Sequence, residues 1–570
     1  MMQMVFIRRA HFKILLLALC AALFGCGRSA PAETGVPAAP DAQQDVIQKW
    51  TVPSESAGAE DNAQSPEPAA PDPRIAQMKP VSLPPDALRL SMRHPLTMNP
   101  LLNRDVTVDR ALKFVFEPLF ILDGADKPVP NLVSDYSLSA DGLSVSVTLR
   151  DGLAWEDGEP VTTDDLAYSI DVLKHAPPDA MYRDSAAAID GCAPVDARNA
   201  IIRFTAASWY NLYELAFPVI PRHYYSASGY STVTSIPPLG DGQYKFGKFD
   251  GAKGIDFAAA GNYKGEPSIG SVQFLITPDH ETDCDAFAQG LTDALPTTLN
   301  EWAKYSGVQN VSVTEYASQN YDFIGFNYTR ALFQNPNARR ALACAVDLND
   351  AVNSVYLGHA VRAYSPINPT SWLFVQDNGP PEYDLGAAKT LFAQSGLDFS
   401  GAKARLKTGE AEQDVRLVIL VNSDNNERAK LAAILKDGLA KLAIDAAVES
   451  VPFDEYKRRV AALDYDIFIG GFNLSAVPDL TFAFGSVNRS NIFGYSDAAM
   501  NACLARMTGA TSESAFKAAA GDLQRYFYDT VPVVSVAFRN NALLTNPRVT
   551  AAAKPTLFYE FSDIAQMKLG

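Results

Sequence analysis

Hydrophobic and polar residues follow a strand–helix pattern from residue 415 onward. Val415 to Val421 is almost entirely β-branched or leucine, which is typical of a buried strand. The polar run Asn422 to Asn425 comes next and suits a helix N-cap, so a helix is predicted from about Asn426. Apolar residues at i, i+3 and i+4 spacing predict one buried face, with three lysines pointing elsewhere: Leu431, Ile434, Leu435, Leu439 and Leu442, against Lys430, Lys436 and Lys441.

Two further strands follow this helix. Ala446 to Val451 predicts a second strand, Tyr456 to Leu463 a short helix, and Tyr465 to Gly471 a third strand. This succession predicts parallel pairing with right-handed crossovers. Ligands of such sheets lie beyond the strand ends, so the aromatic and polar tip from Phe472 to Ser475 is the first candidate for a binding site.

The N-terminal half shows similar signals. Ala87 to Met92 and Ser144 to Leu149 predict strands, and an apolar helix is predicted around Ala111 to Phe116. In the run from Leu149 to Leu166, Asp-Gly pairs mark turns of a β-hairpin. Threonine and aspartate at the end of that run predict a capped helix.

Length and charge narrow the class of protein. A chain of 570 residues is too long for one core and predicts several structural units. The composition is that of a globular protein, with 47% hydrophobic and 20% charged residues. A net charge of −17 argues against a nucleic-acid partner, because phosphate binding needs a surface dominated by Lys and Arg.

The first residues carry an export signal. Arg8, Arg9 and Lys13 precede an apolar run from Ile14 to Phe24 that is too short to remain as a membrane helix. The run ends at Leu23-Phe24-Gly25-Cys26 and resembles a bacterial lipoprotein signal, residues 1–25. That resemblance implies a mature chain that begins at Cys26 and is held on the extracytoplasmic face of the cell membrane by a lipid on the thiol. The alternatives are a plain signal peptide with an incidental Cys26, and twin-arginine export through Arg8-Arg9.

Residues 26–80 differ in composition from the rest. From Gly27 to Pro80 there are nine prolines, eight acidic residues and one aromatic residue, Trp50. Such a segment cannot bury enough apolar area to fold, so it predicts a disordered tether. The four cysteines beyond it lie far apart and lack metal-binding spacing, which leaves one disulfide or free buried thiols: Cys192, Cys284, Cys344 and Cys503.

A series of short motifs runs in order from Val81 to the C-terminus. In chain order they are Pro95 to Leu102, Glu117-Pro118-Leu119, Val129 to Leu132, Leu149 to Leu166, Leu239 to Tyr244, Asn262-Tyr263, Gly290 to Ala294, Gly325-Phe326-Asn327, Ser365 to Pro369 and Tyr383-Asp384. In this order they resemble the family 5 extracellular solute-binding proteins, the peptide-binding and related receptors of ABC importers. Collinear order over this length is more specific than any one motif.

The resemblance implies an α/β protein with a periplasmic-binding-protein-like type II bilobed fold and an extra inserted domain. It implies a monomer that encloses a solute between its lobes and passes it to ABC permease and ATPase subunits. Two strands near residues 320 and 540 would form the hinge. The implied boundaries are 81–117, 237–320 and 541–570 for lobe I, 118–236 for the inserted domain, and 321–540 for lobe II.

The ligand chemistry depends on the tip at Phe472. In peptide-binding relatives an aspartate behind this tip pairs with the peptide's α-amino group; here Asn473 and Ser475 follow, and Ser475 takes the aspartate's place. Asp479 either supplies the missing charge or forms a structural turn with Pro478. A peptide held by its backbone, a blocked peptide or a non-peptide solute (a glycan, a metal chelate or an opine-like compound) remain open. So does a surface sensor that signals to a partner.

Three further residues are candidates for ligand contact. Tyr321 follows Asn320 at the implied hinge, and Asn103 occupies a loop that faces the ligand in relatives. Asn491 lies after the tip, where a solvated loop is the alternative.

Enzyme and metal readings find little support. The chain has no HExxH and no GxSxG motif, and its six histidines are scattered. His280 and Cys284 share helical i, i+4 spacing but lack a third ligand, and Asp347 to Asp350 fits a helix N-cap better than a calcium loop. The sequence therefore predicts a binding protein without catalytic residues, metal or cofactor.

Overall fold

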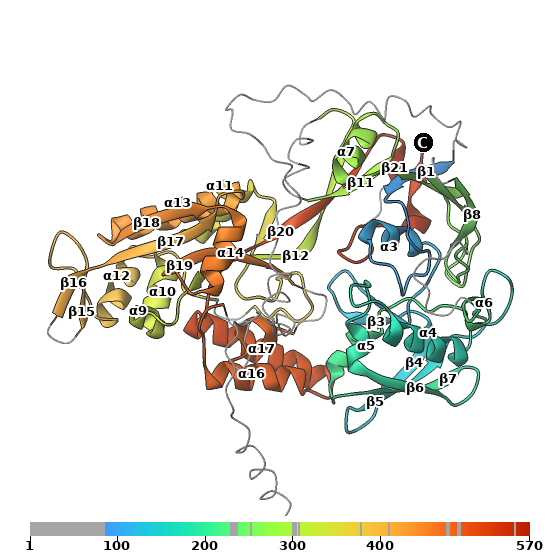
Figure 1. Ribbon diagram of the computed structural model, residues 1–570, viewed down its shortest axis with the longest axis horizontal. Coiled ribbons are helices and arrows are strands. Elements are labelled where there is room, and N and C mark those ends of the chain that lie inside the picture. The colour runs from blue at the N-terminus through green and yellow to red at the C-terminus, as the bar shows by residue number, and fades with distance from the viewer. Residues whose placement is uncertain are drawn as a thin grey trace, which may run out of the picture. The chain divides into compact units, whose positions relative to one another are not determined.

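The computed structural model divides the chain into two units, residues 1–41 and 42–570 (Figure 1). Every described residue belongs to the second unit. The structure describes residues 86–227, 237–250, 254–298, 302, 305, 308–376, 379–408, 411–474, 479–486, 492–551 and 554–570. The predicted signal, the tether and Cys26 therefore lie outside the described residues. None of the described helices is long and apolar enough to cross a membrane.

Lobe I, inserted domain and lobe II denote the residue ranges that the family resemblance implies, and these boundaries stay predictions. The ranges of lobe I contain a sheet of four strands in the order β1-β10-β9-β8. Its strands are β1 (Ala87–Met92), β10 (Ser271–Ile276), β9 (Gly254–Ala259) and β8 (Tyr244–Asp250). β1 and β10 run parallel, so their carboxyl ends meet at one edge. The predicted β1 is confirmed residue for residue.

The helix predicted around Ala111 to Phe116 lies earlier, as α3 (Val106–Leu112). Asp105 caps its start by accepting a hydrogen bond from the Thr107 amide at 2.7 Å. Beyond Lys113 the backbone leaves the helix because the carbonyls of Phe114 and Val115 accept hydrogen bonds from the amides of Tyr244 and Gly242. Pairing with a distant segment thus ends the helix, which no local pattern could indicate.

The inserted domain carries an antiparallel sheet in the order β4-β5-β7-β6. Its elements are β2 (Phe120–Leu122), β3 (Pro128–Pro130), β4 (Val133–Leu138), β5 (Ser144–Leu149), α4 (Thr163–His175), α5 (Ser185–Ala188), β6 (Ile189–Pro194), β7 (Asn199–Phe204), η1 (Trp209–Leu215) and α6 (Arg222–Tyr225). The predicted capping box is confirmed at Thr162 and Asp165. The hairpin before it is reduced to one bridge between Ala154 and Pro160, with Gly158 at a φ of 91° in the turn.

A sheet of seven strands reaches from lobe I into lobe II. Its order is β11 (Ala294–Thr297), β20 (Val534–Thr545), β12 (Ser312–Phe326), β19 (Ile467–Asn473), β17 (Arg416–Asn422) and β18 (Asp445–Val451), with β13 (Ala360–Arg362) paired to β20. β17 pairs in parallel with both β18 and β19. The parallel pairing predicted from the hydrophobic pattern is confirmed.

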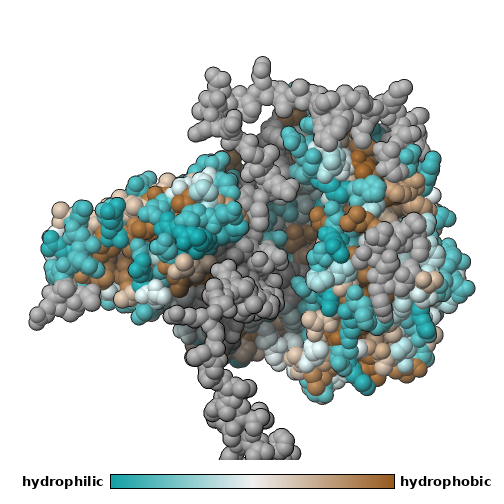
Figure 2. Space-filling view, in the orientation of Figure 1, coloured by the Kyte–Doolittle hydropathy of each residue, from teal (hydrophilic) through white to brown (hydrophobic). Residues whose placement is uncertain are grey.

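The helices predicted beside these strands are also present. α13 (Asn426–Lys441) begins at the predicted residue, and α14 (Phe453–Ala461) begins three residues before the predicted Tyr456. Leu431, Leu435 and Leu439 are buried, whereas the three lysines of α13 are exposed. Figure 2 accordingly shows a largely hydrophilic surface over α13 and α14.

β20 pairs with β12 along most of its length and with β11 at one end, and β12 pairs with β19 at the other. The β12–β20 register shifts between Ala317 and Tyr321, where Ser318 Oγ donates to the Arg539 carbonyl at 2.5 Å. This irregularity coincides with the residues at which a hinge is expected. The hinge itself stays a prediction.

Smaller elements complete the described chain. They are α7 (His280–Ala288), α9 (Ala331–Gln334), α10 (Pro336–Cys344), α11 (Leu348–Tyr356), α12 (Leu385–Gln394), β14 (Leu397–Asp398), β15 (Arg405–Thr408), β16 (Ala411–Asp414), α15 (Thr481–Phe484), α16 (Ala498–Thr508), α17 (Glu513–Thr530), β21 (Val549–Ala551), η3 (Ile564–Gln566) and β22 (Lys568–Leu569). One continuous apolar core joins lobe I, the inserted domain and part of lobe II, including α14, α16 and α17, and a second lies among α7, α10 to α13 and the strands of the long sheet. The four described cysteines are free thiols, and only Cys192 is not fully buried.

Candidate functional site

The predicted tip begins with a residue of the core. Phe472 is 1% exposed, and its ring lies 4.8 Å from Phe323 and 5.3 Å from Phe482 between centroids. Asn473, the last residue of β19, is exposed and pairs with Asn320 of β12. Of these two tip residues, only Asn473 therefore presents a polar side chain to solvent.

Tyr321 lies beside Phe472 in the same register. It is fully buried, its hydroxyl hydrogen-bonds Ser535 Oγ at 2.7 Å, and burial raises its pKa. Tyr321 and Phe472 thus belong to the apolar core, at the point where β19 ends beside the middle of β12. Ser475 and Asn491, also predicted here, lie outside the described residues.

Asp479 is described and has a local role. Its carboxylate accepts hydrogen bonds from the Thr481 amide at 2.8 Å and the Thr481 hydroxyl at 2.9 Å, and so shapes the start of α15. Burial, and then the Asp479 carboxylate, raise the pKa of Tyr210 in the inserted domain. The Asp479 charge thus acts on a tyrosine of the inserted domain.

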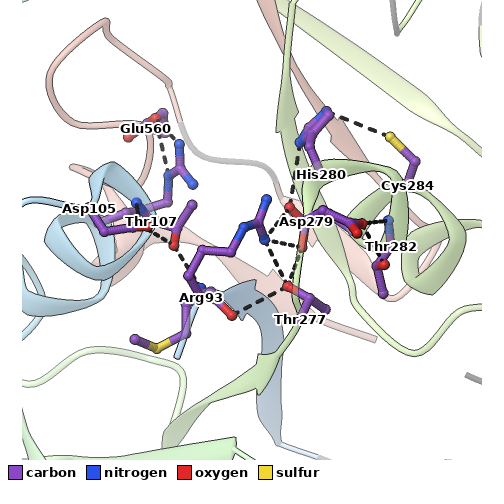
Figure 3. A network of polar contacts seen from close by, with 12 residues as sticks. Arg93, Asp105, Thr107, Thr277, Asp279, His280, Thr282, Cys284 and Glu560 are labelled. Carbon is purple, nitrogen blue, oxygen red and sulfur yellow. Dashed lines mark hydrogen bonds and ion pairs between the residues drawn. The ribbon is translucent and has the colours of Figure 1, made fainter. Parts of the chain in front are cut away.

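Asn103 shapes the loop between β1 and α3. Its side chain is buried, accepts from the Asp105 amide at 3.1 Å and donates to the Asp105 carbonyl at 2.8 Å. Figure 3 shows how the same loop is anchored beyond the ends of β1 and β10. The Arg93 amide donates to Thr107 Oγ1 at 2.8 Å, and its guanidinium reaches Thr277 Oγ1 and Asp283 at 2.9 Å. The loop is thus rigidly held, with the Asn103 side chain turned to its own backbone.

Figure 3 also shows the His280 and Cys284 pair on α7. Cys284 Sγ lies 3.6 Å from His280 Nε2, and His280 Nδ1 lies 3.5 Å from Asp283. Among the described residues no three His, Cys, Asp or Glu side chains are arranged to hold a metal ion.

A cavity of about 340 Å³ opens between α3, the start of the inserted domain and the C-terminal segment. Aromatic side chains line much of it, including Phe114, Tyr244, Tyr559 and Phe561. Its three cations are already paired with acidic groups. The pairs are Arg110 with Glu560 at 2.8 Å, Lys113 with Asp109 at 2.8 Å, and Lys264 with Glu117 at 2.6 Å.

Two other carboxylates line this cavity without such a partner. Asp123 and Asp563 have no cation within ion-pair distance among the described residues. Asp123 instead accepts from the amides of Ala125 and Lys127 at 2.8 and 3.0 Å, which fixes the β2–β3 turn. An aromatic wall with unpaired carboxylates suits an amine or other cation attached to an apolar group.

The β2–β3 turn connects this cavity to the end of β19. Asp126 accepts a hydrogen bond from Gln319 Nε2 at 2.7 Å, and the Gln319 carbonyl accepts from the Leu474 amide at 2.9 Å. Burial, and then the neighbouring Asp123, raise the pKa of Asp126 to about 6. Gln319 therefore links the β2–β3 turn, which lines the cavity, to the predicted tip.

A buried acid pair lies behind the cavity. The Glu117 amide donates to Asp241 Oδ1 at 2.9 Å, and burial together with Glu117 raises the pKa of Asp241. Glu117 is held by Asn131 at 2.9 Å and by Lys264. These residues belong to the Glu-Pro-Leu and Gly-Asp-Gly motifs, so the motifs have a structural explanation.

Sequence reasoning missed the residues that line the cavity. Asp123 had a local signal, the Asp-Gly-Ala-Asp turn that it begins between two apolar runs. Asp563 had none, because the C-terminal segment reaches the cavity only through the tertiary fold.

Comparison with known proteins decides the class of the chain. The profile described as bacterial extracellular solute-binding proteins, family 5 Middle, matches residues 127–493. The chain belongs to this family. Its members are extracellular binding proteins, so the predicted fold class and the prediction of a binding protein instead of an enzyme are both confirmed.

Individual relatives are distant. Oligopeptide-binding protein AppA of Bacillus subtilis is 21% identical over 400 residues, which cover 64% of this family 5 chain and 72% of the relative. Heme-binding protein A of Haemophilus influenzae is 24% identical over 332 residues, which cover 57% of this chain and 58% of the relative. The crystal structure of the ABC transporter substrate binding protein CtaP from Listeria monocytogenes superposes with a TM-score of 0.69 at 19% identity, covering 85% of this chain and 99% of that structure. This last likeness supports the bilobed fold.

Proposed function

We propose that this chain is the substrate-binding component of an ABC importer. It captures a peptide or peptide-like solute between lobe I and lobe II and delivers it to a membrane permease with its ATPase subunits. Family membership and the oligopeptide-binding and ABC-transporter relatives support this proposal. Closure captures the solute because the solute contacts both lobes only when they are closed.

The observation that carries the proposal is the cavity with its aromatic walls and unpaired carboxylates. A peptide amine needs a negative charge in a site with little water, and Ser475 cannot supply one. Asp123 of the inserted domain and Asp563 of lobe I offer that charge, next to Tyr559 and Phe561. Asn473, which is exposed, would then hydrogen-bond the peptide backbone together with Ser475 and Asn491, and Asp479 would support them.

A non-peptide solute is the second candidate. Heme-binding protein A is a relative of similar distance, and the five aromatic residues of the cavity would also suit a flat, apolar solute. A surface sensor would use the same site without a permease. Co-purification of permease and ATPase subunits with the solute-loaded protein separates import from sensing.

The test is a binding screen on the purified soluble domain. Thermal shift and calorimetry are measured with tripeptides, their N-acetylated forms, oligosaccharides and metal chelates including heme. The proposal predicts a saturable shift with peptides, larger for free amines than for acetylated forms. No shift with any peptide, together with a saturable shift for a sugar or a chelate, would overturn the peptide assignment.

Membrane attachment is the remaining part of the proposal. We assign a lipid to Cys26 and a tether to residues 26–80, which would leave a monomeric receptor free to move near the extracytoplasmic face. The lipoprotein-like run Leu23 to Cys26 supports this assignment.

A further inference from the structure

The inserted domain contacts lobe II through Trp372, which follows β13 in the chain. The Trp372 amide donates to the Ala125 carbonyl at 2.9 Å, and its indole Nε1 donates to the Tyr213 hydroxyl at 2.9 Å. Both acceptors belong to the inserted domain, one in the β2–β3 turn and one in η1. A single tryptophan of lobe II is therefore hydrogen-bonded to two elements of the inserted domain.

Aromatic rings surround these hydrogen bonds. The Trp209 ring lies 5.2 Å from Trp372 and 5.2 Å from Phe516 of α17, between centroids. Trp209 is 3% exposed and Phe516 is fully buried, so the contact excludes water. The Trp209 amide also donates to the Ala510 carbonyl at 2.6 Å. Rings at these separations attract each other beyond the area they bury.

A charged pair lies at the edge of the aromatic group. Lys127 Nζ lies 2.7 Å from Glu513 of α17 and 5.1 Å from the centre of the Trp372 ring. Both side chains of the ion pair are partly exposed. The ion pair therefore orients the two side chains but contributes little to stability. We call Trp209, Tyr213, Trp372, Phe516 and the Lys127–Glu513 pair the clasp.

The inserted domain is also bound to lobe I, which gives the clasp its importance. Asn131 donates to Glu117 at 2.9 Å, the Met181 amide donates to the Asn103 carbonyl at 2.8 Å, and the Tyr182 hydroxyl donates to Asp109 at 2.8 Å. Besides the strands β12 and β20, the clasp is thus a second connection between lobe II and the body formed by lobe I and the inserted domain. If the lobes separate about β12 and β20, these contacts must break.

We propose that the clasp is a latch that favours the closed state of the receptor before a solute binds. A contact made only in the closed state raises the population of that state, and it does so whether or not the site is filled. Solute binding then has to supply less of the free energy that closes the lobes. The affinity for the solute therefore rises with the population of the closed state. Loss of the clasp should lower the affinity and speed up release.

This inference rests on the proposed function only in assuming that the lobes close on a solute. Its primary test therefore uses the protein without solute. Spin labels are placed at Val195 of the inserted domain, which is 64% exposed, and at Lys436 on the exposed face of α13. The variants are Val195→Cys and Lys436→Cys in a Cys192→Ser background, because the other three described thiols are buried. Pulsed electron resonance then reports the distance distribution between inserted domain and lobe II.

Trp372→Ala is expected to broaden this distribution toward longer distances, and Glu513→Lys to shift it in the same direction by less. Glu513 is exposed, so its substitution tests the latch without affecting the core. Tyr383→Ala is the matched control, since Tyr383 is an aromatic residue of lobe II that is 40% exposed and lies against Lys441 of α13. Circular dichroism melts confirm that each variant is folded.

A Trp372→Ala distribution equal to that of the Tyr383→Ala control would overturn the latch. With a solute from the binding screen, Trp372→Ala should also release it roughly tenfold faster, as expected for the loss of ring contacts and one hydrogen bond. If no solute is found at all, the proposed function fails while the distance measurement still decides on the clasp. The two failures are therefore distinguishable.

Discussion

Asp126 connects the turn beside the cavity to β12, one of the two strands of the predicted hinge. It occupies the left-handed region with a φ of 61°, which aspartate tolerates better than most residues, at the turn between β2 and β3. Its carboxylate is largely buried and accepts a hydrogen bond from Gln319 of β12. Burial and the nearby Asp123 raise its pKa from 3.8 to about 6. The folded protein therefore holds a proton on Asp126 at a pH where the unfolded chain does not.

This shift predicts a pH dependence of stability. Between pH 4 and pH 6 the folded state binds more protons at Asp126 than the unfolded state, so its contribution to stability falls as pH rises through about 6. Asp126→Asn keeps an acceptor for Gln319 and removes the ionisation. We expect Asp126→Asn to melt higher than wild type at pH 7.5 and to lose this advantage by pH 4. The control is Asp454→Asn, at a residue whose side chain is 93% exposed. A melting difference that does not change with pH would contradict this assignment.

Ser475 stands where the family resemblance implies an aspartate in peptide-binding relatives. Ser475→Asp therefore tests the tip against the cavity. If the amine binds at the tip, the affinity for a free-amine tripeptide should rise about tenfold, because a charge-assisted bond replaces a neutral one, whereas it should stay unchanged if the amine binds at Asp123 and Asp563. Calorimetry with the N-acetylated form of the same peptide is the control, and its affinity should not rise. An equal gain for both peptides would place the new charge away from the amine.

Single residues also mark the limit of sequence reasoning about the site. The pattern placed the end of β19 at Gly471, two residues before its end at Asn473, and it could not tell which tip side chain turns inward. Phe472 is in the core, Asn103 bonds its own loop, and Asp479 accepts hydrogen bonds from Thr481 at the start of α15. These residues stay proposed ligand contacts. A strand end exposes alternate residues, and only the packing of distant partners such as Phe323 and Phe482 decides which residue is buried.

At the scale of elements, a buried charge cluster holds the lobe II part of the long strands together. Asp322 of β12 lies 3.3 Å from Arg539 of β20 and 3.6 Å from Arg428 of α13, and it accepts from the Tyr356 hydroxyl of α11 at 3.0 Å. Asp322 and Arg428 are each 2% exposed. A buried carboxylate shared by two guanidinium groups is costly to remove, because both cations then lose their compensation.

Asp322→Asn should therefore lower the free energy of unfolding by about 3 kcal/mol or more. Asparagine keeps the side-chain volume and an acceptor for Tyr356, so the loss of stability measures the contribution of the Asp322 charge. Urea denaturation followed by circular dichroism measures it. Asp454→Asn again serves as the comparison, since it breaks an exposed ion pair with Lys457 and should leave the midpoint unchanged. Equal urea midpoints for the two variants would show that the Asp322 carboxylate does not compensate the charges of Arg428 and Arg539 as the distances suggest.

Elements were predictable wherever the pattern was local. β1 and β5 match residue for residue, and the strands and helices from β17 to β19 lie within three residues of their predicted bounds. Elements whose ends depend on distant partners were not. α3 ends early because Phe114 and Val115 pair with the segment at residues 242–244. The antiparallel pairing of β12 with β20, more than 200 residues apart, leaves no local signal in either strand and was expected only through the family resemblance.

At the scale of the whole molecule, the chain uses its inserted domain twice. It contributes Asp123 to the proposed solute cavity, and through Trp372 and its neighbours it contacts lobe II. Both roles depend on the β2–β3 turn, which lines the cavity on one side and bonds Gln319 and Trp372 on the other. A solute that orders this turn would therefore also strengthen the clasp, so binding and latching should be positively coupled.

The cellular position of the receptor depends on the N-terminal residues, and the chain supplies its own control there. Cys20 and Cys26 lie six residues apart, the first inside the apolar run and the second at its end. If the thiol of Cys26 carries the lipid, Cys26→Ser should move the protein from the membrane fraction to the soluble extracytoplasmic fraction, since the acyl chains that hold it are lost. Cys20→Ser should leave the protein in the membrane fraction, because Cys20 would be removed with the signal. Intact mass measurement should find the acyl mass on the wild type and on Cys20→Ser, but not on Cys26→Ser. Membrane retention of Cys26→Ser would favour a plain signal peptide and another mode of attachment.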